Sequence, residues 1–366
     1  MRTMSHRSLT RIKLRGYRSI AECDLEMRML NILIGANGSG KSNFIGFFGL
    51  VRQMLLGNLQ KAVSKAGGAD TLLHFGRKKT ASLQAEIHFG DCGYLFSLEP
   101  NADNRMIYAD ERLFCNEELN IPDTLKFLPI GSGHFESGLD TLRDIQTYND
   151  IAPIMKKLQV HHFHDTGASS PLRRPHPIHD NDNLRSDAGN LAAYLYDLQQ
   201  CFPDDFQIIV KSIRLVAPFF ERFVLHPQSD NPEMIELEWL EANRDMPLEA
   251  HHISDGMLRF ICLATLLLQP SCKQPEIIII DEPELGLHPY AITILAGLLK
   301  SLSHKKQIIV STQCVDLISE FSLDDIIVAT RENNQSILKR PKSDALQDWL
   351  EEYSLGDLWK KNLLGG

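Results

Sequence analysis

The chain contains a glycine-rich stretch, Gly35-Ala-Asn-Gly-Ser-Gly-Lys-Ser42, that is typical of phosphate-binding loops. The residues just before it, 30–34, are aliphatic except for one asparagine, which predicts a short buried strand. From residue 41 onward, aromatic and aliphatic residues recur at helical spacing, which predicts a helix. A strand, a glycine loop and a helix in this order let backbone N–H groups and a helix N-terminus surround phosphate groups. The sequence therefore predicts a nucleotide-phosphate site at this loop.

The spacing G-x-x-x-x-G-K-[ST] assigns roles to individual residues of this stretch, which we call the phosphate loop (residues 35–42). Lys41 would reach the β- and γ-phosphates of ATP, and the hydroxyl of Ser42 would bind Mg²⁺. ATP and Mg²⁺ are therefore the expected cofactors. The expected ATP-binding residues of this segment are Gly35, Ala36, Asn37, Gly38, Ser39, Gly40, Lys41, Ser42 and Asn43.

A second apolar run, the four isoleucines at 277–280, ends in two acidic residues, Asp281 and Glu282. Unpaired carboxylates at the tip of a buried strand are costly unless a cation lies nearby. We expect Asp281 to contact Mg²⁺ through water and Glu282 to act as the general base that polarises the attacking water. A strand that merely ends in an acidic turn is the alternative, and the presence of the phosphate loop in the same chain disfavours it.

Alternating strands and helices near both ends of the chain predict an α/β fold with a parallel sheet. Consecutive strands at 82–89 and 93–98 predict an antiparallel flank, which makes the expected sheet mixed. Helical periodicity dominates the middle of the chain. We therefore expect an N-terminal ATPase lobe at 1–139, an inserted helical lobe at 140–250 and a C-terminal ATPase lobe at 251–366.

Composition limits where the protein acts and what it binds. The chain has 38 basic and 47 acidic residues, a formal net charge of −9, so its overall charge does not indicate a nucleic-acid binder. Short basic clusters such as Arg173-Arg174 could form a local basic face, but a solvated surface is the simpler interpretation. Seven scattered cysteines with no C-x-x-C pair predict reduced thiols and a cytoplasmic protein. No apolar run reaches 18 residues, so no membrane span is expected.

Three further motifs resemble those of ABC-type ATPases. Ser254, Asp255 and Gly256 open an apolar helix about twenty residues before the acidic strand and resemble the signature loop, which binds the γ-phosphate held by the opposite protomer. The resemblance implies a homodimer with two shared sites. Leu287 and His288 lie at the position of the D-loop, which connects the two protomers. An ordinary helix start is the alternative for residues 254–256, since Asp-Gly turns before helices are common.

Gln313 follows a predicted strand, at the position where transporter ATPases have their switch histidine. A neutral amide can bond the γ-phosphate but cannot titrate, so the resemblance leaves the rate of hydrolysis open. This departure is more similar to the DNA-repair branch than to the transporters. Residues 14–20 (LRGYRSI) resemble the opening strand of RecF and SMC proteins, which implies that Arg18 and Ser19 lie near the nucleotide; an ordinary turn is the alternative.

Taken together, the motifs resemble the RecF-like predicted ATPases of the OLD and AAA-21 type, members of the ABC ATPase superfamily related to SMC and RecF heads. The similar segments span nearly the whole length and include SDGMLRF, DEPELGLHP and the terminal YSLGDLWKKNLLGG. The resemblance implies an ABC-type P-loop head in which the phosphate loop is the Walker A motif and residues 277–282 are Walker B. It further implies DNA repair or anti-phage defence, with a nuclease or other effector as partner and DNA as a candidate ligand.

Several alternatives stay open at this point. The favoured function is an ATP-hydrolysing switch that dimerises; a nucleotide-gated sensor with negligible turnover is a second class, and a transporter ATPase subunit is a third. The resemblance also implies a Q-loop, a segment that lies near the bound metal. Either Gln159 or the pair His164-Asp165 supplies it. The histidine group 161–164 also suggests a metal site, although no second set of ligands at suitable spacing is evident.

Overall fold

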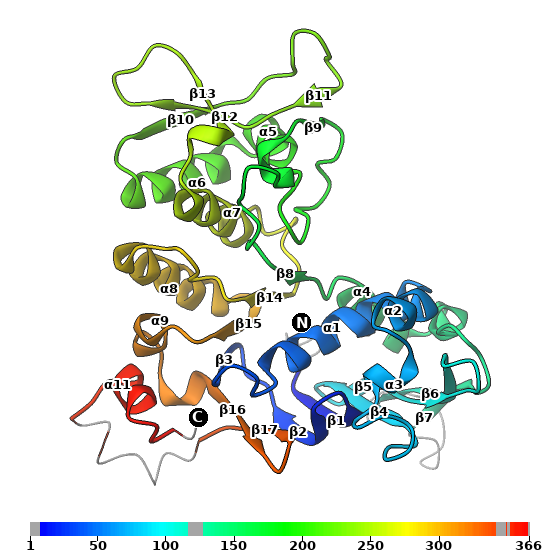
Figure 1. Cartoon of the computed structure of the whole chain (residues 1–366). Helices are drawn as coiled ribbons and strands as arrows, with labels where there is room; N and C mark the ends of the chain where they lie inside the picture. The colour runs from blue at the N-terminus through cyan, green and yellow to red at the C-terminus, as the bar shows by residue number, and fades with distance from the viewer. Residues whose placement is uncertain (1–7, 116–126, 342–348, 350–351, 365–366) are drawn as a thin grey trace. The chain divides into compact units, whose positions relative to one another are not determined.

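A computed structural model describes residues 8–115, 127–341, 349 and 352–364 of the 366-residue chain. The chain divides into two compact units. The first contains residues 1–160, 275–279 and 303–366, and the second contains residues 161–274 and 280–302. Each unit is therefore built from segments that are far apart in the sequence. Figure 1 shows the course of the chain through both.

The described residues form two six-stranded sheets. In spatial order the first sheet contains β2 (Ile20–Glu26), β1 (Arg11–Tyr17), β4 (Leu83–Phe89), β5 (Cys92–Pro100), β6 (Met106–Cys115) and β7 (Phe127–Gly131). All of its neighbouring strands are antiparallel. Side chains along β4 are buried at every second position, as expected for a strand with one face on a core. This sheet is the antiparallel flank that the sequence predicted.

The second sheet contains, in spatial order, β17 (Gln335–Lys339), β16 (Ile326–Glu332), β3 (Leu30–Ile34), β15 (Gln307–Thr312), β14 (Ile277–Asp281) and β8 (Val160–His161). Strand β3 runs parallel to both β15 and β16, whereas β16 and β17 are antiparallel. All five residues of β3 are buried, because both faces of a parallel strand are covered. The expected α/β fold with a mixed sheet is confirmed.

Helix α1 (Lys41–Leu55) begins at the phosphate loop and lies at the centre of the first unit's core. Its buried side chains include Phe44, Phe47 and Phe48, which share one hydrophobic cluster with residues of both sheets. Figure 1 shows α1 beside the antiparallel sheet. The other helices among the described residues of this unit are α2 (Leu59–Lys65), α3 (Ala69–Leu72), α4 (Gln146–Lys156), α9 (Val315–Ser319) and α11 (Leu355–Lys360), and 3-10 turns occur at Leu139–Leu142 and Leu323–Asp325. The core therefore holds the start of α1, and with it the phosphate loop, in place.

The second unit contains the helices α5 (Leu191–Cys201), α6 (Pro203–Val216), α7 (Asp255–Leu268) and nearly all of α8 (Pro289–Ser303). Its short strands are β9 (His176–Pro177), β10 (Phe220–Val224), β11 (Met234–Ile235), β12 (Glu238–Glu241) and β13 (Leu248–Glu249), and its 3-10 turns are η3 (Pro171–Arg173) and η4 (Ala250–His252). The three-stranded sheet β10-β12-β13 was not expected in a region whose periodicity predicts helices. The expected domain ranges stay predictions.

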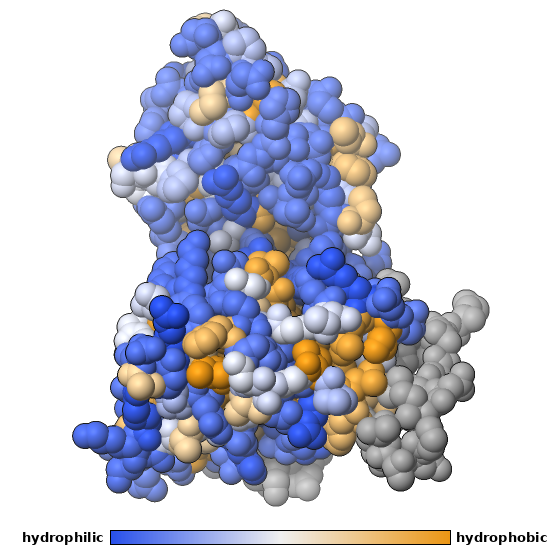
Figure 2. Space-filling view, turned by 90° about the vertical axis from the view of Figure 1, so that its right-hand side faces the viewer, coloured by the Kyte–Doolittle hydropathy of each residue, from blue (hydrophilic) through white to orange (hydrophobic). Residues whose placement is uncertain are grey.

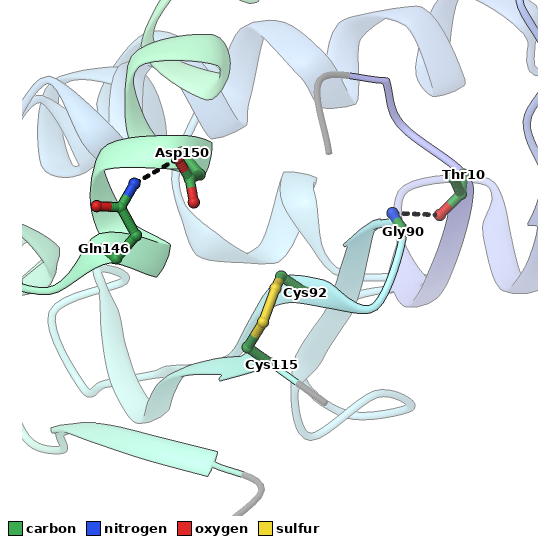
Figure 3. The surroundings of a disulfide bond; sticks show 6 residues. All are labelled: Thr10, Gly90, Cys92, Cys115, Gln146 and Asp150. Carbon is green, nitrogen blue, oxygen red and sulfur yellow. Dashed lines mark hydrogen bonds between the residues drawn. A yellow bond between two sulfur atoms is a disulfide. The ribbon is translucent and has the colours of Figure 1, made fainter. Parts of the chain in front are cut away.

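The expectation that all seven cysteines are reduced is wrong for one pair. Cys92 and Cys115 form a disulfide bond in the first unit (Figure 3). They stand directly opposite each other on β5 and β6. Residues in register on neighbouring antiparallel strands are close enough for their side chains to meet. The spacing of the two cysteines along the sequence does not reveal this pairing, because the register of the two strands produces it.

Removal of this disulfide is expected to lower the free energy of unfolding by about 3 kcal/mol, since the bond closes a loop with a sequence separation of 23 residues. Denaturant unfolding of the double variant C92S/C115S, compared with the oxidised wild type, measures the loss. The variant C201S is a matched control, because Cys201 is a free and exposed cysteine. An unfolding midpoint unchanged in the double variant would contradict the expectation.

Large apolar side chains are exposed at several places on the first unit, including Leu56 after α1, Phe127 in β7 and Phe135 beyond it. Figure 2 shows hydrophobic residues interspersed with polar ones on one face of the molecule.

Within the described part of the chain, no helix is both long enough and apolar enough to cross a membrane.

Candidate functional site

The phosphate loop connects the buried strand β3 to α1 in the first unit. Its outer residues Ala36, Asn37 and Gly38 are exposed, whereas Lys41 is only 5% exposed. The Lys41 ammonium lies within the loop, where its Nζ donates to the carbonyl oxygens of Gly35 (2.5 Å) and Ala36 (3.1 Å). A cation held inside a loop with an exposed backbone is suited to bind an anion such as a phosphate group.

Glycine is required at position 40, the residue that caps the N-terminus of α1. Its φ is +108°, and a Cβ atom there would lie 2.1 Å from Oγ of Ser336 and 3.1 Å from Oγ of Ser19. Any side chain would therefore clash with neighbours and adopt an unfavourable backbone conformation. The same distances place Ser19 and Ser336 directly beside the phosphate loop.

Arg18 and Ser19 form the turn between β1 and β2, in which Tyr17 pairs with Ile20. The turn nevertheless lies against the start of α1. Nδ2 of Asn43 donates to Oγ of Ser19 (2.6 Å), and Nη1 of Arg18 donates to Oδ1 of Asn43 (3.5 Å). Arg18 has a φ of +48°, which is uncommon for a residue with a side chain. Arg18 and Ser19 therefore form a turn, and this turn also lies beside the phosphate loop.

Tyr17, the residue before this turn, is buried and lies next to Arg18. The Arg18 guanidinium lies 5.4 Å from the centre of the Tyr17 ring. Burial raises the pKa of Tyr17 to about 12, and the nearby positive charge of Arg18 acts in the opposite direction. Tyr17 is therefore neutral at physiological pH, and its ring packs edge-on against Phe47 of α1. These contacts fix the turn relative to the helix that follows the phosphate loop.

Gln313 lies at the same edge of the sheet as the phosphate loop. Thr312, the last residue of β15, is in register with Ile34, the last residue of β3, and the two strands are parallel. Gln313 therefore leaves its strand where the phosphate loop leaves β3. Sequence reasoning missed two further neighbours: Ser336, described above, and Arg331, whose Nη1 donates to the carbonyl oxygen of Gly38 (3.3 Å). Both come from β16 and β17, almost 300 residues along the chain, and no local pattern marks them.

The two acidic residues at the end of β14 belong to the second unit. The Asp281 side chain is 12% exposed, and one of its carboxylate oxygens lies 3.5 Å from Nδ1 of His162. The Asp281 carbonyl oxygen lies 3.1 Å from Nε2 of His164. Glu282 follows with a φ of +47°, a backbone conformation that side chains rarely adopt and that is common at functional sites. The histidine segment is therefore adjacent to the acidic strand end.

Ser42 and Asp281 offer the oxygen ligands that Mg²⁺ prefers. The Ser42 side chain is exposed at the first turn of α1, and the Asp281 carboxylate is nearly buried. These donors fit the ion chemically. Histidine is a less suitable ligand for Mg²⁺. For the metal site suggested by the histidine group 161–164, the described residues contain no group of three or more His, Cys, Asp or Glu side chains that could hold a metal ion.

The predicted signature residues form the start of α7. Ser254 caps the helix, and its Oγ accepts a hydrogen bond from the backbone N–H of Met257 (3.3 Å). Ser254 and Asp255 are exposed. Gly256 packs on the backbone of Gly286, because a Cβ atom at position 256 would lie 2.2 Å from the Gly286 carbonyl oxygen. An exposed helix N-terminus with a capping serine can bind an anion.

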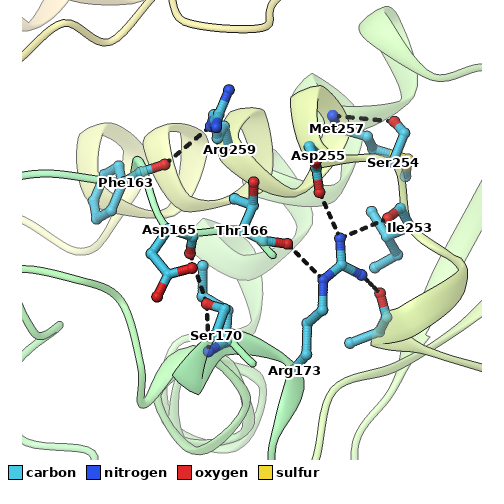
Figure 4. A network of polar contacts seen from close by, with 12 residues as sticks. Phe163, Asp165, Thr166, Ser170, Arg173, Ile253, Ser254, Asp255, Met257 and Arg259 are labelled. Atoms are coloured by element: carbon cyan, nitrogen blue, oxygen red, sulfur yellow. Dashed lines mark hydrogen bonds and ion pairs between the residues drawn. The ribbon is translucent and has the colours of Figure 1, made fainter. Parts of the chain in front are cut away.

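Arg259, one turn into α7, connects three segments of the second unit. Its guanidinium donates to the carbonyl oxygens of Phe163 (3.1 Å), His164 (2.9 Å) and Leu285 (2.8 Å). Figure 4 shows the bond to Phe163. The signature helix, the histidine segment and the turn after the acidic pair are therefore held together by one cation. Sequence reasoning did not identify this role.

The predicted D-loop residues lie in the turn between β14 and α8. The N–H of Leu287 donates to the carbonyl oxygen of Glu284 (3.0 Å), and Nδ1 of His288 accepts from the N–H of Tyr290 (3.3 Å) at the start of α8. His288 and Tyr290 are exposed. The candidate residues thus form two groups: the phosphate loop and its neighbours in the first unit, and the acidic pair, signature and D-loop in the second.

Comparison with known proteins gives a family match over most of the chain. The family model described as "AAA domain, putative AbiEii toxin, Type IV TA system" matches residues 30–318. This range contains the phosphate loop, the predicted signature, the acidic strand end and Gln313.

Two solved structures share the fold. A crystal structure of the Smc head bound to the C-winged helix domain of ScpA has a TM-score of 0.61 and 17% identity, and covers 92% of this chain and 98% of that chain. The Smc head domain with an extended coiled coil, bound to the C-terminal domain of ScpA from Pyrococcus furiosus, has a TM-score of 0.60 and 16% identity, and covers 94% and 98%. At these identities the likeness shows the fold alone.

Curated relatives match over shorter segments. The energy-coupling factor transporter ATP-binding protein EcfA of Methanocaldococcus jannaschii is 37% identical over 73 residues, which are 20% of this chain and 25% of that protein. A protein of Methanosarcina acetivorans named "Putative ABC transporter ATP-binding protein" is 30% identical over 126 residues, 32% of this chain and 44% of that protein. The chain thus spans less than half the length of these curated relatives.

Proposed function

The chain belongs to the AAA_21 family of P-loop ATPase domains, and from this premise we propose that it binds and hydrolyses ATP as a molecular switch that dimerises. The observation that carries the proposal is the phosphate loop, in which the buried Lys41 ammonium lies beneath an exposed glycine-rich backbone. The fold of an Smc head supports the same proposal.

In the first unit, the phosphate loop and Asn43 bind the triphosphate of ATP. Lys41 exchanges its two carbonyl partners for phosphate oxygens, so its charge is already in position before the ligand arrives. Arg18 and Ser19 contact the nucleotide from the turn that packs on Asn43. Gln313 bonds the γ-phosphate through its neutral amide, from the strand in register with β3.

Hydrolysis requires a base beside the γ-phosphate. Glu282 accepts a proton from the attacking water as the general base. Mg²⁺, bound by Ser42 and through water by Asp281, would neutralise charge on the phosphate oxygens. The pair His164-Asp165 is favoured over Gln159 for the Q-loop role, because His164 is bonded to the carbonyl of Asp281.

The composite site explains why ATP would drive dimerisation. The signature loop of Ser254, Asp255 and Gly256 at the exposed start of α7 binds the γ-phosphate held by a second copy of the chain through Ser254 and Gly256, and Leu287 and His288 contact that copy. A ligand shifts an equilibrium only through its different affinity for the two states. Since the signature residues meet phosphate only in the closed dimer, ATP favours the closed state and hydrolysis releases it.

We further propose that the switch acts in a DNA-related process, DNA repair or anti-phage defence, with a nuclease or other effector as partner. The motifs shared with RecF-like ATPases and the Smc-like fold support this assignment. A transporter subunit is less well supported: the curated transporter proteins match over 25% and 44% of their lengths, and Gln313 replaces the histidine expected in that class.

The experiment that tests the proposal is ATP turnover by the purified chain, alone and with double-stranded or single-stranded DNA. Phosphate release that DNA stimulates, accompanied by ATP-dependent dimerisation in light scattering, is the expected result. Tight ATP binding without turnover, unchanged by DNA, would favour the nucleotide-gated sensor instead. The absence of any ATP binding would refute the proposal as a whole.

A further inference from the structure

Arg173 is a buried cation, although the sequence alone favours a solvated surface for the cluster Arg173-Arg174. Its side chain is only 6% exposed, although it comes from the short turn η3. The guanidinium donates to the carbonyl oxygens of Thr166 (2.7 Å), Ala250 and Ile253 (3.0 Å) (Figure 4). The interpretation of Arg173 as part of a solvated basic cluster is therefore wrong, whereas its neighbour Arg174 is exposed.

The fourth partner of Arg173 is the carboxylate of Asp255. Nη2 of Arg173 lies 2.8 Å from Oδ1 of Asp255, which is the first residue of α7 and 60% exposed. The carbonyl partners Ala250 and Ile253 belong to the segment immediately before Ser254. One guanidinium therefore contacts the signature loop on both sides of its capping serine.

Asp255 presents an electrostatic difficulty for the proposed function. A carboxylate in the first turn of a helix stabilises the helix itself. The same negative charge repels the γ-phosphate that the signature residues are proposed to bind. Three of the four acceptors of Arg173 are neutral carbonyls, so Asp255 is the only anion among them. The positive charge of Arg173 is therefore available to offset the negative charge of Asp255.

We propose that Arg173 is a positioning residue for the signature loop, and that it makes the loop receptive to phosphate by neutralising Asp255. Its bonds to Ala250 and Ile253 hold the segment that carries Ser254, and its ion pair cancels the charge beside the phosphate position. Arginine suits this task because its planar group carries five N–H donors and stays charged when buried. The inference rests on the proposed function, since it concerns phosphate bound in trans.

The test measures ATP-dependent dimerisation by light scattering in a Glu282→Gln parent, which slows hydrolysis. Arg173→Met in this parent is expected to weaken dimerisation by about tenfold, because the charge of Asp255 is no longer offset. Adding Asp255→Asn to Arg173→Met is expected to restore most of the loss. Arg174→Met is the matched control, since Arg174 is adjacent and exposed. ATP affinity of the single chain is measured in parallel, because its phosphate loop lies in the other unit.

The outcomes separate charge compensation from a merely structural role. If Arg173→Met weakens dimerisation and Asp255→Asn does not restore it, or if Arg173→Met has no effect, the inference is overturned. Should Arg173→Met fail to fold, Asp255→Asn alone decides: it should tighten dimerisation in the parent, and weaker dimerisation would overturn the inference. A parent that binds ATP and stays monomeric overturns the proposed dimerising switch, and this inference with it.

Discussion

The variant Lys41→Ala is expected to lose the rise in melting temperature that ATP confers on the wild-type chain. Lys41 is buried in the phosphate loop, and its ammonium contacts the carbonyls of Gly35 and Ala36. Without this charge, the triphosphate would meet the same carbonyl oxygens with no cation to offset them. ATP at roughly 100 times its dissociation constant adds about 2.7 kcal/mol to the stability of a wild-type protein, and the variant should gain almost none of it.

Differential scanning fluorimetry with and without ATP and Mg²⁺ measures this difference. The comparison is made within each variant, because removal of a buried lysine also changes the stability of the ligand-free chain. Lys61→Ala is the matched control, since Lys61 is an exposed lysine of α2. An ATP-induced shift of wild-type size in Lys41→Ala would contradict the assignment of the phosphate loop as the ATP site.

The variant Glu282→Gln is expected to reduce ATP turnover by about 10²–10⁴-fold, the usual contribution of a general base. The amide keeps nearly the shape of the carboxylate but cannot accept the proton of the attacking water. Glu282 directly follows β14 and has a φ of +47°. Because ATP would remain bound and intact, the variant should also accumulate as an ATP-bound dimer.

Phosphate release and light scattering, followed on the same sample, test both parts of this expectation. Glu332→Gln serves as the control, since Glu332 is an exposed glutamate at the end of β16. Turnover close to that of the wild type would show that another group is the base. Low turnover without a dimer would keep the catalytic assignment and reject the composite site.

Much of the fold could be predicted because its signals are local. The strand at 30–34 and the helix from Lys41 were expected from apolar runs and helical spacing, and they occur as β3 and α1. The antiparallel strands 82–89 and 93–98 were expected from alternation and a turn, and they occur as β4 and β5. The sheet β10-β12-β13 was missed, since its strands are two to five residues long and too short for a clear period.

The candidate site was predictable only in part, for the same reason. The phosphate loop carries its chemistry within eight consecutive residues, and Gly40 has the positive φ that favours glycine. Ser336 and Arg331 reach the same loop from strands β17 and β16, almost 300 residues away. Their presence depends on the order of strands in the sheet, about which a single sequence carries no local signal.

The elements with local causes could thus be predicted from the chain alone: the buried strand, the phosphate loop, the helix after it and the acidic end of β14. Tertiary structure alone decided which distant groups meet. It paired Cys92 with Cys115 through strand register, and it buried Arg173 against Asp255, 82 residues further along the chain. Dihedral preferences and periodicity act between neighbours, whereas ion pairs and disulfides depend on where packing brings separate segments together.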